Sequence, residues 1–106
     1  MKQSRKRYLM FRLHMDGPPI AGRQLTHEIW RSFQSLFGEV ETSDARLFLN
    51  EYDEKTGIGY LQCNMSSLEN VITAAALIES IDRTRVSFEP KRASGTIKSL
   101  LRRKSQ

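Results

Sequence analysis

The chain has 106 residues, enough for one domain with a real core, and its 39% hydrophobic and 27% charged residues argue against wholesale disorder. One cysteine, Cys63, excludes an internal disulfide, and together with two histidines it leaves no zinc-site spacing. The net charge is +5, no apolar run approaches the ~20 residues of a membrane helix, and no secretory signal with a cleavage site is visible, so we expect a cytoplasmic protein.

The first half of the body begins with a strand and a helix. Alternating side chains predict a strand over Arg7–Met15, which the run beginning at Asp16 ends because prolines cannot donate to a ladder. Helical spacing of apolar residues then predicts a helix over Arg23–Phe37, with Gly38 as its stop. Trp30 falls on the broad apolar stripe of this helix, so we expect a core or stripe-edge residue rather than a platform that stacks on a base.

A hairpin follows. The segments Arg46–Tyr52 and Ile58–Asn64 alternate like strands, and the loop Asp53–Gly57 between them has hairpin composition. Alternation in the first of these strands places Phe48 and Tyr52 on the same face. Cys63 lies in the second strand, where we expect it to act as a small buried hydrophobe.

The last third contains a helix, a strand and a short basic helix. The capping-box pattern of Ser66–Glu69 starts a helix that we expect to reach about Ser80. A fourth strand is predicted over Arg85–Glu89, closed by Pro90, and a further helix over about Thr96–Lys104. The order β-α-β-β-α-β predicts an α+β sandwich of the ferredoxin-like or RRM-like type, with both long helices on one sheet face and an added C-terminal helix.

Positive charge is concentrated at the two ends of this single domain. The expected organisation is a basic tail over 1–6, a body over 7–90 and a basic segment with a helix over 91–106. Residues 1–7 carry four basic groups and residues 91–106 carry six, with no acid in either, whereas residues 8–90 hold 7 basic and 12 acidic groups. Like-charged ends repel unless an anion lies beside them, and a polyphosphate backbone would supply it. Solubilising tails and an anionic membrane surface are the alternatives, the second weakened by the lack of bulky apolar anchors.

Two segments could contact RNA. Thr56–Cys63 keeps both glycines and one aromatic residue of the RNP1 pattern of RNA recognition motifs, and Tyr8 could join Tyr60 as half a stacking platform. We favour the alternative that the aromatic residues of the strands pack under a helix or a partner protein. In Lys91–Lys98, a glycine before a predicted helix would let phosphate approach free backbone N–H groups. Plain helix capping by Ser94 or Thr96 explains the hydroxyls, but it does not explain why the predicted helix carries only basic charges.

Several fragments, in order, resemble one known family over roughly residues 5–104. They are RYLMFR at Arg7–Arg12, EIW at Glu28–Trp30, FGE at Phe37–Glu39, YDEKTGIG at Tyr52–Gly59 and ASGTIK at Ala93–Lys98. Together they resemble the archaeal ribonuclease P protein component 2 family, relatives of a eukaryotic ribonuclease P/MRP subunit. The segment Phe88–Lys91 departs from the family, which has a more aliphatic run there.

The resemblance implies a ferredoxin-like sandwich with extra helix cover and a role as a protein subunit of ribonuclease P. In that enzyme RNA with bound Mg²⁺ removes the 5′ leader of precursor tRNA, so no catalytic residue, metal or cofactor is expected on this chain. The implied partners are ribonuclease P RNA, a TIM-barrel-like protein subunit and other ribonuclease P proteins, with precursor tRNA contacted indirectly. A homodimer within a heterotetramer is one arrangement that the resemblance allows.

These considerations give a hypothesis with named residues. The predicted RNA-binding residues are Arg5, Lys6, Arg7, Lys91, Arg92, Ser94, Gly95, Thr96, Lys98, Arg102, Arg103 and Lys104. The predicted protein-partner face comprises Tyr8, Phe48, Tyr52 and Tyr60. The alternatives are a generic, ribosomal-type RNA-binding accessory protein, an acylphosphatase-like hydrolase on the same fold, and a small-molecule regulatory domain, which would need no basic tails. The hydrolase needs an anion-cradling loop that Asp16–Arg23 does not supply.

Overall fold

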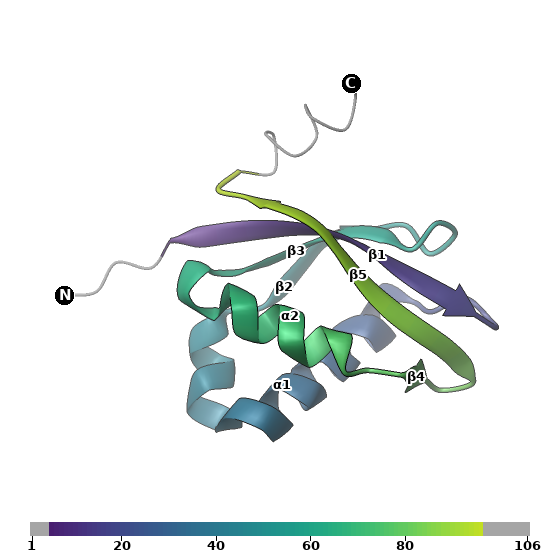
Figure 1. Ribbon diagram of the computed structural model, residues 1–106, viewed down its shortest axis with the longest axis horizontal. Coiled ribbons are helices and arrows are strands. Elements are labelled where there is room, and N and C mark those ends of the chain that lie inside the picture. The colour runs from purple at the N-terminus through teal and green to yellow at the C-terminus, as the bar shows by residue number, and fades with distance from the viewer. Residues whose placement is uncertain (1–4, 97–106) are drawn as a thin grey trace.

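Two helices lie on one face of a five-stranded antiparallel sheet in the computed structural model, which describes residues 5–96 (Figure 1). The elements are β1 (Lys6–Asp16), α1 (Gly22–Ala45), β2 (Phe48–Tyr52), β3 (Ile58–Asn64), a 3₁₀ turn (Met65–Ser67), α2 (Leu68–Ala76), β4 (Ser80–Ile81) and β5 (Thr84–Ser94). The predicted C-terminal helix lies outside the described residues. Neither α1 nor α2 combines the length and apolar character that crossing a bilayer requires.

The strand order β2-β3-β1-β5-β4 confirms the ferredoxin-like arrangement and adds β4 as a short edge strand. The centre of the sheet depends on a glycine, because Phe11 on β1 pairs with Gly59 on β3 and its ring lies across that position. A Cβ atom at Gly59 would stand 2.7 Å from Phe11 Cζ, closer than carbon atoms can pack. Only glycine therefore lets the Phe11 ring cover the middle of the sheet.

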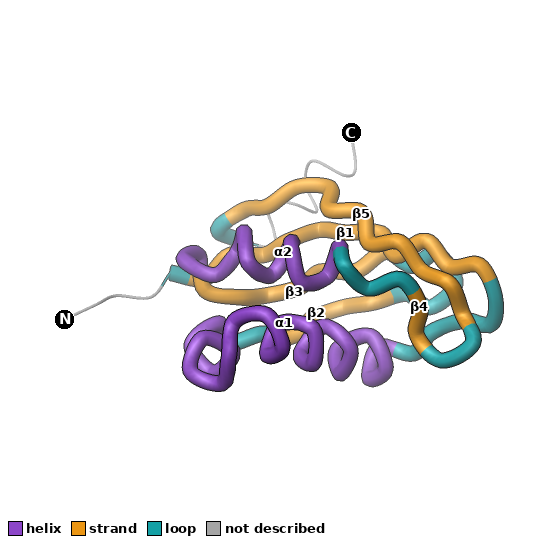
Figure 2. Tube along the Cα trace, turned by 60° about the horizontal axis from the view of Figure 1, so that its bottom comes forward, coloured by secondary structure: helices purple, strands orange, loops and turns teal. Residues whose placement is uncertain are grey.

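Figure 2 shows the sheet and the helices as two layers. The hydrophobic core lies between them. The fully buried side chains that meet there are Leu9, Phe11 and Leu13 from β1 and Leu25, Ile29 and Phe33 from α1. Burying each such side chain contributes about 1.5–3 kcal/mol, so this layer holds both helices on the sheet. Cys63 is 1% exposed, which confirms its expected role, and burial raises the pKa of its thiol to about 11.

The first helix is longer than predicted because Gly38 kinks it instead of ending it. Gly38 has φ 90° and ψ 173°, yet helical structure resumes and continues to Ala45. The hydroxyl of Thr42 donates a 2.7 Å hydrogen bond to the Gly38 carbonyl, and Thr42 and Ala45 are both buried. Burial of this second segment therefore outweighs the break, and the chain turns only at Arg46, which adopts the left-handed conformation.

The second helix starts and ends differently from the prediction. The expected capping box at Ser66–Glu69 does not form: the 3₁₀ turn precedes α2, and Ser67 occupies the N-cap position without a side-chain hydrogen bond. The helix ends at Ala76 rather than near Ser80, because the chain then extends into β4 and buries Ile81 against the core. Two strand residues are too few to give a recognisable alternation.

The register of β2 overturns one predicted face. A β-bulge between Leu49 and Glu51 shifts the pairing with β3, so the alternation along β2 is interrupted. Phe48 remains on the open face of the sheet, but Tyr52 turns to the helix side and packs against the core. Its ring centroid lies 6.3 Å from that of Phe11.

The last strand continues past the predicted end. Pro90 lies within β5, which runs on to Ser94, so the strand does not end at Pro90 as predicted. Prolines are tolerated at bulges and sheet edges. The pairing with β1 shifts between Met10 and Phe11, where Phe11 pairs with Pro90, and β4 covers β5 only at Thr84 and Arg85. Both conditions for a strand proline are therefore met.

Candidate nucleic-acid interface

The described parts of the two basic ends of the chain meet at one end of the sheet. The start of β1 runs antiparallel to the end of β5, so Tyr8 pairs with Ser94 and Met10 with Arg92 (Figure 1). The guanidinium of Arg7 reaches Gly95, where a Cβ atom would lie 3.3 Å from Arg7 Nη1. We call this region the basic sheet end. Its residues are Arg5, Lys6, Arg7, Lys91, Arg92, Ser94, Gly95 and Thr96.

Most cations of the basic sheet end face solvent. Arg5, Lys6, Lys91 and Arg92 are exposed, and Arg7 is half-buried, with its guanidinium donating a 3.0 Å hydrogen bond to the Lys6 carbonyl. The other predicted cations lie outside the described residues; they are Lys98, Arg102, Arg103 and Lys104.

Lys91 is already engaged by an acid. Its Nζ lies 3.2 Å from Glu89 Oε2, while Glu89 Oε1 lies 2.6 Å from Nε2 of His14 on the neighbouring strand. Hydrogen bonds from His14 and then Lys91 lower the pKa of Glu89 below its ordinary value. The positive charge available at Lys91 is therefore smaller than its presence in the sequence indicates.

Ser94 uses its hydroxyl locally. The backbone N–H of Thr96 donates a 3.3 Å hydrogen bond to Ser94 Oγ. This is the capping-type contact that the sequence offered as the alternative to phosphate binding. Ser94 is half-buried and is the last residue of β5. Of the residues predicted to follow the strand, only Gly95 and Thr96 therefore lie beyond the sheet within the described part of the chain.

The sequence prediction did not include one exposed cation on this surface. Arg12 is exposed and pairs with Glu89 across the two central strands, on the same face as Met10 and Tyr8. The alternation of β1 already places every second residue on that face, and this was the signal that could have identified it.

The four aromatic residues predicted to form one partner face do not stay together. Tyr8, Phe48 and Tyr60 share the open face, where Tyr8 and Phe48 both pair with Gln62, so the predicted common face of Tyr8 and Tyr60 is confirmed. Tyr60 is only 4% exposed, and its hydroxyl finds no hydrogen-bond partner among residues 5–96. Tyr52 faces the helices, and burial, with smaller contributions from Glu54 and Asp53, raises its pKa to about 12.

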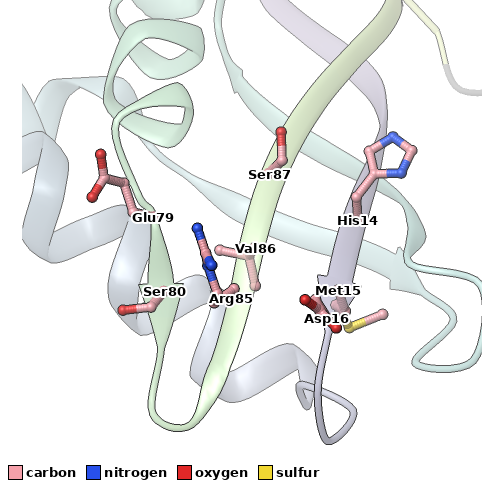
Figure 3. A pocket seen from close by; sticks show the side chains of 8 residues that line it. All are labelled: His14, Met15, Asp16, Glu79, Ser80, Arg85, Val86 and Ser87. Atoms are coloured by element: carbon pink, nitrogen blue, oxygen red, sulfur yellow. The ribbon is translucent and has the colours of Figure 1, made fainter.

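A polar hollow of about 840 Å³ opens at the opposite end of β1 and β5. Figure 3 shows Arg85 on the side of β5 nearer Glu79, whereas His14 stands apart on β1. Asp16 and Glu79 place negative charge around this single arginine, so the hollow has no strong preference for anions. Within residues 5–96, no group of three or more His, Cys, Asp or Glu side chains is arranged to hold a metal ion.

Comparison with known proteins gives one consistent result. The model of the Rpp14/Pop5 family matches residues 7–104. Ribonuclease P protein component 2 of Pyrococcus furiosus is 27% identical over 101 residues, which cover 95% of this chain and 83% of that protein. The protein of the same name from Methanosarcina acetivorans is 31% identical over 97 residues, covering 91% and 70%.

A solved structure shares the fold. A chain in the cryo-EM structure of yeast ribonuclease MRP superimposes with a TM-score of 0.70 and covers 100% of this chain and 95% of its own length. The sequence identity is 8%, so this similarity concerns the fold alone.

Proposed function

Because this chain belongs to the Rpp14/Pop5 family, we propose that it is a noncatalytic protein subunit of ribonuclease P. Its relatives carry the name ribonuclease P protein component 2. In this proposal RNA removes the 5′ leader of precursor tRNA, and the chain binds that RNA together with a TIM-barrel-like protein subunit and other ribonuclease P proteins. The assembly is cytoplasmic, and a homodimer of this chain within a heterotetramer is compatible with it.

The observation that supports the proposal most directly is the convergence at the basic sheet end. Residues near position 6 and residues near position 92 are brought side by side by the pairing of β1 with β5. Cations held on paired strands keep a fixed spacing, and phosphate contacts of this kind position a nucleic acid without reading its sequence. Each phosphate neutralised releases counterions, so affinity falls steeply with salt.

The chain's own chemistry in this proposal is charge neutralisation. Arg5, Lys6, Arg7 and Arg92 offset repulsion between RNA segments that must approach each other in the folded state. Mg²⁺ held by the RNA would supply the activated nucleophile and stabilise the leaving oxygen. A protein that supplies positive charge lowers the Mg²⁺ concentration at which the RNA folds.

Reconstitution tests this proposal. The purified chain is mixed with ribonuclease P RNA and the other protein subunits at limiting Mg²⁺, and cleavage of precursor tRNA is measured. We expect the chain to increase cleavage and to lower the Mg²⁺ concentration needed. An RNA-binding accessory protein of the ribosomal type would bind the RNA equally well but leave cleavage unchanged, and that result would reject the proposal.

The structure gives a reason not to favour the acylphosphatase-like alternative. An anion cradle after β1 needs several free backbone N–H groups. Pro18 and Pro19 have none, and the Pro18 carbonyl accepts a hydrogen bond from the hydroxyl of Thr84, which ties the loop to the start of β5.

A further inference from the structure

A second surface lies on the flank of the molecule where α1 runs beside the edge strand β2 (Figure 2). Trp30, which the helical pattern predicted as a core or stripe-edge residue, is 40% exposed there and so lies at the edge of the stripe. Its side chain lines a groove of about 590 Å³ between the helix and Leu49 of β2. We call this surface the Trp30 groove and define it by Arg23, His27, Trp30, Arg31 and Leu49.

The groove combines an apolar floor with a row of basic side chains. Arg23, His27 and Arg31 follow each other at four-residue spacing, so they are neighbours along one face of α1. None of the residues that line the groove is an acid. Among these three side chains, within residues 5–96, Arg31 alone forms an ion pair, at 3.2 Å from Glu28, which is outside the lining.

We infer that the Trp30 groove docks a segment of a partner protein that presents an apolar side chain between carboxylates. The apolar side chain would cover the Trp30 indole and Leu49, and the carboxylates would lie opposite Arg23 and His27. Trp and Arg are the residue types that most often dominate protein–protein binding energies, and they do so where an apolar centre is ringed by polar groups. The inference rests on the proposed function, which supplies a multiprotein assembly as the source of the partner.

A protein fits this groove better than RNA does. The charged rim is small, and Glu28 places negative charge beside Arg31, which opposes a phosphate backbone. Among the strands of residues 5–96, β2 lies at the edge of the sheet, so its outer backbone donors and acceptors are beside the groove, where a protein segment can use them. The groove also lies along the first half of α1, whereas the other end of α1 approaches the basic sheet end, where Asn64 donates to the Asp44 carbonyl.

The chain offers a direct probe, because Trp30 is its only tryptophan. The full chain is labelled with 5-fluorotryptophan, and its single ¹⁹F resonance is recorded alone over a range of concentrations, with ribonuclease P RNA, and with the TIM-barrel-like and other ribonuclease P protein subunits. We expect the resonance to move with a protein subunit and to stay in place with RNA or dilution. A shift with RNA alone would overturn the inference in favour of a nucleotide site, a shift with concentration would indicate a second copy, and no shift with any protein would remove the site.

Substitutions complete the test. Trp30→Ala should weaken binding of the protein subunit by about tenfold or more, and Arg23→Glu should weaken it through charge reversal. Val40→Ala is the matched control, since Val40 is 72% exposed on the same helix and lines no part of the groove. Circular dichroism confirms folding of each variant, and Trp30→Phe keeps a ring if Trp30→Ala fails to fold. If the groove variants bind the protein subunit with unchanged affinity and stimulate cleavage normally, the groove is rejected and the proposed function stands. If the chain binds the subunit through the groove but never stimulates cleavage, the proposed function is rejected and the groove stands.

Discussion

The basic sheet end and the Trp30 groove differ in the main force by which each would bind a partner. The basic sheet end has exposed cations on two paired strands, so its attraction for an anion acts at a distance and is weakened by salt. The Trp30 groove has an exposed indole against Leu49 and few charges, so its binding requires close contact and removal of water. In the two proposals, this small fold binds two classes of partner without competition, because each surface relies mainly on a different force.

Both surfaces depend on one core, so removing a side chain at its centre should impair both surfaces together. Phe11 is fully buried, and its ring centroid lies 4.8 Å from that of Phe88. Phe11→Ala should lower the free energy of unfolding by about 3–5 kcal/mol, measured by urea denaturation. RNA binding and subunit binding should fall together, and loss of only one would show that the two surfaces are held independently.

Salt dependence should separate the two surfaces. If about six phosphates are engaged, the logarithm of the RNA affinity should fall with the logarithm of salt concentration at a slope of about −4 to −5. Replacing both Arg7 and Arg92 by Ala should make this slope shallower by about 1.5, while binding at the Trp30 groove keeps its weaker dependence. Arg83→Ala is the control, because Arg83 is an exposed cation, like Arg92, and lies in the turn between β4 and β5. An unchanged slope in the double variant would exclude these two side chains from the RNA contact.

The smallest effect concerns the acid that pairs with Lys91. Glu89→Gln should strengthen RNA binding a few-fold, because it removes one negative charge and releases Lys91, while subunit binding stays constant.

The same variant should change how stability depends on pH. Since folding lowers the pKa of Glu89, the contribution of Glu89 to stability is complete above the pKa of the unfolded chain and is lost as the pH falls through the folded pKa. Thermal unfolding between pH 6 and about pH 3 should therefore be less pH-dependent in the variant than in the wild type; equal pH dependence would contradict the pairing. Glu79→Gln serves as the matched control, and an equal gain in RNA affinity there would indicate a general charge effect.

Much of this fold could be predicted from the alternation of residues within individual β-strands. The alternation of Ile58–Asn64 predicted β3 with its observed bounds, and β1 differs from its prediction by one residue at each end. Such patterns depend only on which face of one strand is buried. The convergence of the basic segments was also predictable in outline, because the predicted ferredoxin-like topology pairs the first and last strands.

The errors arose where neighbouring elements decide the outcome. The bulge that turned Tyr52 away from Phe48 is a property of the β2–β3 pairing and leaves no mark in the β2 sequence. Trp30 is 40% exposed, and the helical stripe alone could not decide between its core and stripe-edge positions. The strand character of Lys91–Ser94 came from pairing with β1 across a bulge, against the local signal of Pro90.

The antiparallel pairing of β1 with β5 has a practical consequence for anyone who handles this protein. A purification handle or fluorescent fusion attached at either terminus enters the folded body beside the same cationic surface. An acidic handle there would act as a tethered competitor, with an effective concentration set by its linker, and would mask nucleic-acid affinity in an otherwise intact protein. An insertion in the exposed Asp53–Thr56 part of the β2–β3 hairpin loop would avoid that interference.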